Sequence, residues 1–181
     1  EEWFAREALW AMREGSLDVA ALRRALQAPG RKAVLGTSFA LVHLDEQLRA
    51  SERFALGEDG LVMQTGGFKG RSRELDARAM RAMLAQRFGV PEHRVVSEYG
   101  MTELSSQLYG RGILEGALAS DGDERLWAPG WVRATPVHPE TLAPVGEGEV
   151  GILRLDDCAN LYSVCSIQTA DLARREGDAI V

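Results

Sequence analysis

The chain has 181 residues, of which 45% are hydrophobic and 27% charged, and its formal net charge is −6. This composition is typical of a globular protein and excludes a disordered chain, while the acidic balance argues against a general nucleic-acid binder. No apolar run in the sequence reaches the length of a membrane span. Two cysteines, Cys158 and Cys165, fit neither a common zinc pattern nor a disulfide scaffold. We therefore expect a cytoplasmic protein with reduced, half-buried thiols.

The first part of the sequence alternates between helix and strand patterns. An aromatic-rich pattern predicts a helix over residues 2–13, and Ser16 or Asp18 is suited to cap a second helix that stops at Pro29. Short apolar segments predict strands over 32–35, 61–64 and 95–96. Apolar spacing predicts further helices over 44–53 and 73–88, the latter ended by Gly89. Alternation of this kind predicts parallel strands in an α/β layer.

After about residue 116 the pattern changes to strands without helices. Strands are predicted over 129–137, 149–155 and 161–167, with turn-rich stretches around them. The predicted fold class is therefore α/β, with a parallel sheet followed by a smaller, mostly antiparallel β lobe. We place the two lobes at 1–116 and 117–181.

Several polar residues carry only weak functional signals. Ser38, after Gly36 and Thr37, is expected to be a turn or capping residue and not a nucleophile. The segment 65–72 follows a strand and is basic, but it lacks the Lys-Ser/Thr step of a phosphate-binding loop. Its basic residues fit either a solvated turn or a contact with a nucleotide. The three histidines are far apart in sequence, which argues against a zinc site.

The strongest motif is the segment Tyr99-Gly100-Met101-Thr102-Glu103, which we place where a strand ends and a helix begins. Open parallel sheets bind ligands at that edge, and free amides at a helix start bind phosphate. Tyr99 is suited to stack on a base, Thr102 to donate to a phosphate oxygen, and Glu103 to hold Mg²⁺. Taken alone, five residues favour a structural explanation in which Thr102 and Glu103 cap a helix.

This pattern resembles the Tyr-Gly-x-Thr-Glu signature of the adenylate-forming superfamily, which includes acyl-CoA synthetases, luciferases and nonribosomal peptide adenylation domains. Thr65-Gly66-Gly67 resembles the upstream adenine loop, and Thr169-Ala170-Asp171-Leu172 resembles the later motif whose aspartate binds the ribose hydroxyls. The resemblance implies ATP and Mg²⁺ as cofactors. It implies Thr102 and Glu103 as catalytic residues, with Glu103 as the metal ligand. The nucleotide-binding residues that it implies are Gly66, Gly67, Tyr99, Gly100, Met101 and Asp171.

The closer similarity is to the acyl-protein synthetases of bacterial bioluminescence. The matching segments are Gly36–Leu41, Gln64–Gly70, Ser97–Leu104, Pro129–Arg133, Asp157–Asn160 and Thr169–Leu172. This branch implies that ATP activates a fatty acid to an acyl-adenylate, that the acyl group passes to a protein cysteine, and that an acyl reductase is a partner. Ala170 replaces the usual glycine, and Cys158 stands where the family has an aliphatic residue.

We expect the chain to be an internal fragment of an adenylate-forming N-terminal domain, because the upstream phosphate loop and the downstream small domain of the family are absent. Such a fragment is expected to be inactive by itself, and the acyl-accepting cysteine is expected outside it. Two other functions stay open. One is a coenzyme A ligase of the phenylacetate–CoA ligase type, and the other is a non-catalytic module that binds or scaffolds.

Overall fold

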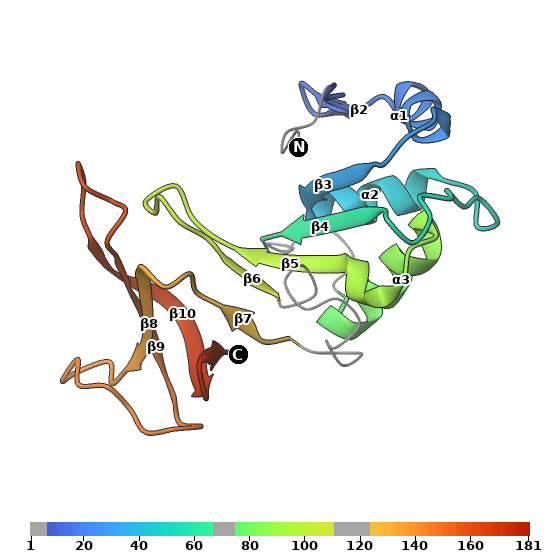
Figure 1. The fold of residues 1–181 in the computed structure, drawn as a ribbon. Coiled ribbons are helices and arrows are strands. Elements are labelled where there is room, and N and C mark those ends of the chain that lie inside the picture. Colours follow the sequence, from blue (N-terminus) through green and yellow to red (C-terminus); the bar gives the residue numbers. More distant parts are fainter. Residues whose placement is uncertain (1–6, 67–74, 111–123) are drawn as a thin grey trace.

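A computed structural model describes residues 7–66, 75–110 and 124–181 of the chain, and Figure 1 shows the arrangement of its elements. The helices are α1 (Val19–Gln27), α2 (Ser38–Gln47), α3 (Ala77–Phe88) and the short 3-10 helix η1 (Glu92–Arg94). The strands up to residue 110 are β1 (Met12–Arg13), β2 (Ser16–Leu17), β3 (Ala33–Thr37), β4 (Leu61–Thr65), β5 (Val95–Tyr99) and β6 (Leu108–Gly110). The later strands are β7 (Leu126–Trp127), β8 (Val132–Val137), β9 (Val150–Asp157), β10 (Ser166–Glu176) and β11 (Ala179–Ile180).

Within the described residues, nine strands form one mixed sheet in the order β3-β4-β5-β6-β7-β11-β10-β9-β8. The strands β3, β4 and β5 are parallel, whereas each following pair of neighbours is antiparallel. The helices α2 and α3 lie on one face of the parallel strands, behind them in Figure 1. The predicted α/β class, with a parallel sheet followed by a mostly antiparallel part, is confirmed.

The helices begin and end at residues whose side chains or backbone suit those positions. Asp18, Thr37 and Asp76 each accept a hydrogen bond from the backbone amide three residues later, at 2.8, 3.2 and 2.7 Å. These N-caps satisfy amides that have no partner within the helix. Gly89 ends α3 in the left-handed conformation, with φ of 62°. The predicted cap at Asp18 and the predicted stop at Gly89 are both confirmed.

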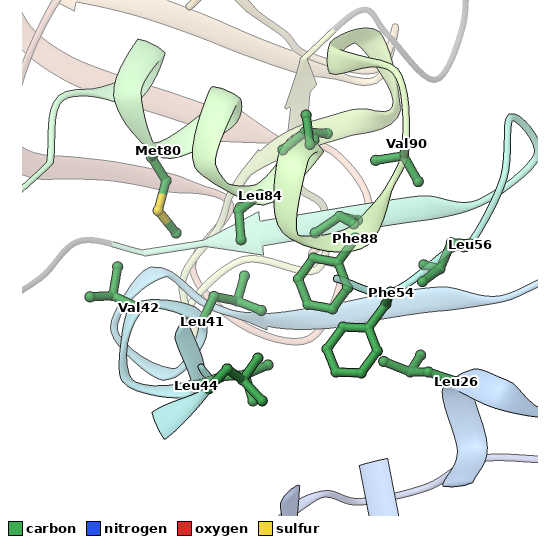
Figure 2. Packing of buried hydrophobic residues seen from close by; sticks show 14 of the residues in the cluster. Leu26, Leu41, Val42, Leu44, Phe54, Leu56, Met80, Leu84, Phe88 and Val90 are labelled. Atoms are coloured by element: carbon green, nitrogen blue, oxygen red, sulfur yellow. The ribbon is translucent and has the colours of Figure 1, made fainter. Parts of the chain in front are cut away.

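The first hydrophobic core fills the space between the parallel strands and their helices. Figure 2 shows Met80, Leu84 and Phe88 of α3 pointing toward apolar side chains of α2. The ring of Phe88 stacks on that of Phe54 with 5.7 Å between centroids, and both rings are buried. Full burial of one such side chain stabilises the folded state by about 1.5–3 kcal/mol. Arg87 joins the two helices at the edge of this core through an ion pair with Asp45, in which 2.6 Å separates Nη2 from Oδ1.

Side chains of the antiparallel strands form a second hydrophobic core. Along β9, alternate side chains face inward, so that Leu153, Leu155 and Asp157 are buried. The other buried members of this core are Leu104, Leu108, Val132, Ala173 and Ile180. The predicted boundary between two lobes, at 116–117, lies outside the described residues, and the division into lobes stays a prediction.

The helix predicted over residues 2–13 is wrong in its described part. Residues 7–11 have no helical assignment, and β1 and β2 form a two-stranded hairpin. The turn consists of Glu14 and Gly15, both with positive φ, at 50° and 77°. Positive φ at both central residues gives the tight turn whose twist matches a hairpin. The aromatic spacing was therefore misleading as evidence for a helix.

Other predicted boundaries shift as well. The helix expected over 44–53 is α2, which begins at Ser38 because Thr37 caps it and ends at Gln47. The strand expected over 161–167 begins only at Ser166, because residues 158–165 form a loop in which the Leu161 amide bonds to the Ala159 carbonyl at 3.0 Å. The helix expected from residue 73 is described from Ala77, and residues 73–74 lie outside the described residues.

Candidate functional site

The parallel strands bring the predicted adenine loop and the predicted Tyr99 to one edge of the sheet. In the register, Thr65 of β4 is the partner of Glu98 of β5, so Gly66, just after β4, and Tyr99, the last residue of β5, lie at neighbouring strand ends. Ligands of open α/β sheets bind outside these carboxyl ends. Gly66 has φ of 67°, a conformation that glycine adopts without steric cost. Gly67 lies outside the described residues, as do Lys69, Arg71 and Arg73.

Ser38 holds the backbone that leads to Gly66. Its side chain is buried, and its Oγ lies 2.6 Å from the carbonyl oxygen of Gly66 and within hydrogen-bond distance of the side-chain oxygen of Gln64. Gln64 Nε2 in turn donates to Ser97 Oγ at 2.8 Å, which ties the ends of β4 and β5 together. The cap predicted for Ser38 belongs to Thr37. The role of Ser38 in the fold is to fix the loop after β4.

Tyr99 and Asp171, two of the predicted site residues, contact each other directly. The Tyr99 hydroxyl donates to Asp171 Oδ2 at 2.6 Å. Asp171 lies where the pairing of β10 with β9 shifts register, between Gln168 and Leu172. Thr169 Oγ1 stabilises this bulge by donating to the Leu153 carbonyl at 2.9 Å and accepting from the Asp171 amide at 3.1 Å. Such bulges re-aim side chains next to binding sites.

The environment of Tyr99 raises its pKa above the ordinary value. Burial of the phenol is the largest cause, followed by its hydrogen bond to Asp171 and the negative charge of that carboxylate. Each of these effects disfavours the phenolate. At neutral pH the Tyr99 hydroxyl is therefore a hydrogen-bond donor to a charged acceptor, which is a stronger bond than one between neutral groups.

Thr102 and Glu103 lie in a turn, and the helix predicted to begin at this point is absent. The segment 100–107 has no helical assignment and leads into β6, which returns antiparallel to β5. Both side chains are exposed, and Thr102 Oγ1 donates to Glu103 Oε2 at 3.1 Å. Met101 packs against the second core and is only partly exposed. The structure therefore pairs Tyr99 with Asp171 and Thr102 with Glu103, and it leaves no helix N-terminus at the motif to bind phosphate.

Two residues for which the sequence analysis predicts no role contact the same turn. Asp157 is 1% exposed and accepts a hydrogen bond from the backbone amide of Ser105, and Asn160 donates to the carbonyl oxygen of Glu103. Both belong to a segment that resembles the family. A carboxylate and an amide three residues apart after a strand were the only signal for them in the sequence.

Cys158 and Cys165 are free and exposed, which corrects the prediction that they are half-buried. Across the part of the chain that the structure describes, no three His, Cys, Asp or Glu side chains gather in a way that would hold a metal ion. Within the same ranges, none of the helices combines the length and apolarity that crossing a membrane requires.

Comparisons with known proteins identify the fold. No family model matches the sequence, and no curated protein matches it. Among solved structures, ATP-bound MatB from Rhodopseudomonas palustris matches 92% of this chain and 33% of its own, with a TM-score of 0.64 and 15% identity. McyG A-PCP in complex with phenylalanyl-adenylate matches 89% of this chain and 27% of its own, with a TM-score of 0.58 and 15% identity.

A third match comes from a study of fatty acyl-adenylate ligases from E. coli and L. pneumophila. It covers 82% of this chain and 33% of its own, with a TM-score of 0.55 and 12% identity. Across these and other similar structures, the chain spans between 27% and 45% of the length of the solved protein. The chain therefore shares its fold with part of each of these solved structures.

Proposed function

We propose that the complete protein carrying this sequence activates a fatty acid with ATP to an acyl-adenylate and transfers the acyl group to a protein cysteine. The observation that carries the proposal is the 2.6 Å hydrogen bond between Tyr99 and Asp171. The resemblance assigns these residues to the adenine and the ribose, two adjacent parts of one nucleoside. Their contact across 72 residues of sequence is what a shared nucleoside site requires.

In this proposal the side chains around the strand ends bind and orient the nucleotide. The ring of Tyr99 lies against the adenine, and the Asp171 carboxylate accepts hydrogen bonds from the ribose hydroxyls. The Thr102 hydroxyl donates to a phosphate oxygen. Gly66, Gly100 and Met101 line the nucleotide. Holding ATP and the carboxylate in reactive geometry is the main contribution that this chemistry asks of the protein.

Glu103 is the residue that would hold Mg²⁺. Its carboxylate is exposed, and its hydrogen-bond partner is the hydroxyl of Thr102, so hard oxygen donors are what this turn offers. Proteins hold Mg²⁺ with one or two carboxylates together with substrate phosphates and water, and a cluster of protein ligands is not needed. The turn fits that pattern. When bound, Mg²⁺ neutralises phosphate charge.

In this proposal the reaction proceeds in two steps. A carboxylate oxygen of the fatty acid bonds to the α-phosphorus of ATP, and the bond from that phosphorus to pyrophosphate breaks. A thiolate then bonds to the acyl carbon, and AMP leaves to give a thioester. We propose an acyl reductase as partner and, because the exposed thiols are free, the reducing cytoplasm as location. The acceptor cysteine lies outside this chain.

The test is ATP–pyrophosphate exchange by the complete protein with a panel of carboxylic acids. We expect medium and long fatty acids to stimulate exchange. Glu103→Ala is expected to lower kcat by about 10²–10³-fold, the usual effect of losing one group that stabilises developing charge. Asp171→Ala is expected to raise KM for ATP roughly 10-fold or more, since it removes hydrogen bonds to a charged group.

Matched controls separate these effects from a general loss of acidic charge. Glu58→Ala and Asp178→Ala remove exposed carboxylates in turns away from the motif, and we expect both variants to exchange like the wild type. A folded complete protein that neither binds ATP nor exchanges pyrophosphate with any acid would refute the enzyme and favour a binding module. Exchange followed by acyl transfer to coenzyme A alone would overturn the protein-thiol acceptor.

A further inference from the structure

The turn that carries Thr102 and Glu103 has little support from its own backbone. Between the end of β5 and the start of β6, the Leu104 amide donates to the Met101 carbonyl at 3.1 Å, and regular pairing resumes at Leu108. A segment outside helix and sheet must find partners for its buried backbone groups elsewhere. Those partners come from the end of β9 and from the loop after it, more than 50 residues later in the sequence.

Asp157 is the first of these partners. It ends β9 with its side chain inside the protein, 1% exposed. Its Oδ2 accepts from the Ser105 amide at 3.1 Å, and its Oδ1 accepts from Ser106 Oγ at 3.0 Å and from the Ala159 amide at 2.9 Å. The indole N–H of Trp131 donates to Ser106 Oγ at 2.9 Å and so extends the network. A buried carboxylate is tolerated only when its oxygens are satisfied in this way.

Asn160 is the second partner, and it reaches Glu103 itself. Its Nδ2 donates to the Glu103 carbonyl at 2.8 Å and to the Val164 carbonyl at 2.9 Å. Its Oδ1 accepts from Ser105 Oγ at 3.2 Å. Both the nitrogen and the oxygen of the Asn160 side-chain amide therefore form hydrogen bonds with the turn. The backbone of Asn160 is fixed in its own place, because its amide donates to the Asp157 carbonyl at 3.2 Å.

We propose that Asp157 and Asn160 are positioning residues that set the location of Glu103 and Thr102. Both residues act through the backbone of the turn and touch no reacting atom. This inference rests on the proposed function, in which Glu103 holds Mg²⁺ beside the phosphates. A displacement of about 1 Å at a reacting group can cost roughly 100-fold in rate.

The test compares Asn160→Ala with Ser166→Ala in the complete protein. Ser166→Ala also removes a side-chain hydrogen bond of the β9–β10 hairpin, from Ser166 Oγ to Asp156 Oδ1 at 2.6 Å, but that bond does not reach the turn. We expect Asn160→Ala to lower kcat of pyrophosphate exchange roughly 10-fold to 100-fold and to raise the Mg²⁺ concentration needed for half-maximal rate. Ser166→Ala is expected to change neither quantity.

Two further measurements give readouts that do not depend on activity. Hydrogen exchange of the amides of residues 102–106 is expected to accelerate in Asn160→Ala and not in Ser166→Ala. Calorimetry is expected to show that Mg²⁺ increases ATP affinity less in Asn160→Ala than in the wild type. Asp157→Asn is a second variant, which places an amide N–H₂ or a weaker acceptor against the Ser105 amide. We expect it to accelerate amide exchange in residues 102–106 and to weaken the effect of Mg²⁺ on ATP affinity, as Asn160→Ala does.

The outcomes distinguish this proposal from the function on which it rests. A wild-type protein that exchanges pyrophosphate, with Asn160→Ala and Asp157→Asn matching Ser166→Ala in amide exchange and in Mg²⁺ dependence, overturns the positioning role alone. A wild-type protein that neither binds ATP nor exchanges pyrophosphate overturns both.

Discussion

The hydrogen bond between Tyr99 and Asp171 joins two side chains that lie 72 residues apart in the sequence. It couples the ionisation of the phenol to the charge of the carboxylate. Because the native-state pKa of Tyr99 is raised above its ordinary value near 10, the protonated phenol stabilises the folded state. That contribution is fully present below the unfolded-state pKa and is lost as the pH rises through the native-state pKa.

We predict that Asp171→Asn lowers the pKa of Tyr99, because the variant removes the negative charge and weakens the acceptor. Burial, the largest cause of the shift, remains, so the pKa is expected to stay above its ordinary value. The measurement is an alkaline titration of ultraviolet absorbance in a Tyr109→Phe, Tyr162→Phe background, in which Tyr99 is the single tyrosine.

The matched control for this titration is Asp178→Asn, which neutralises an exposed carboxylate in the turn between β10 and β11. This control variant is expected to leave the pKa of Tyr99 unchanged. An Asp171→Asn variant that titrates like the control would contradict the contact between the two side chains.

At the same scale, the sequence predicts some contacts and not others. Tyr99 and Asp171 belong to motifs with a fixed order, so their assignment to one site was possible without coordinates. The roles of Asp157 and Ser38 were not predictable in this way. Their partners, Ser106 and Gly66, lie 51 and 28 residues away, and no local pattern records such a contact.

At the scale of the elements, α3 was predictable because its apolar side chains lie on one stripe and Gly89 follows it. The position of α2 was not, because Ser38 on its buried side is polar and the apolar residues from Phe39 to Val42 are consecutive, so the sequence shows no single apolar stripe there. The hairpin β1–β2 was missed because two residues with positive φ decide it, and only one of them is glycine. The turn after β5 was predicted as a helix because a hydroxyl and a carboxylate together are typical of a helix start.

We predict that Gly89→Ala destabilises the protein more than Gly57→Ala does. Both glycines have positive φ, at 62° and 78°, so either alanine costs about 1–2 kcal/mol in backbone conformation. A Cβ at Gly89 would in addition lie 2.5 Å from the Phe54 carbonyl oxygen, whereas a Cβ at Gly57 meets nothing within 4 Å.

The backbone at Phe54 cannot easily move away, since its amide donates to the Arg87 carbonyl at 2.8 Å. We therefore expect an additional cost of roughly 1–3 kcal/mol for Gly89→Ala, as for other overpacked sites. Urea unfolding of the two variants measures the difference. Equal free energies of unfolding would mean that the contact between the end of α3 and the segment around Phe54 is looser than the short distance implies.

At the scale of the whole molecule, one sheet carries two separate cores. The first consists of residues between Leu22 and Val95, and the second of residues between Leu104 and Ile180. The sheet is continuous across them through short strands, since β7 and β11 have two residues each. Side-chain bonds such as those of Tyr99 and Asp157 also cross from the β5–β6 segment to the β9–β10 hairpin. Among the residues that the structure describes, few connections thus join the two cores.

We predict that the two cores respond separately to loss of packing. Leu84 and Leu155 are both 0% exposed, one in each core, and either Leu→Ala substitution is expected to cost about 2–5 kcal/mol. Leu84→Ala is expected to lower the hydrogen-exchange protection of amides in α3, β4 and β5 while those in β8 and β9 keep theirs, and Leu155→Ala the reverse. Separate cooperative units open with separate free energies, which native-state exchange measures amide by amide. If either substitution lowers protection equally in all of these strands, the chain is one cooperative unit, and the short strands and crossing bonds couple the two cores fully.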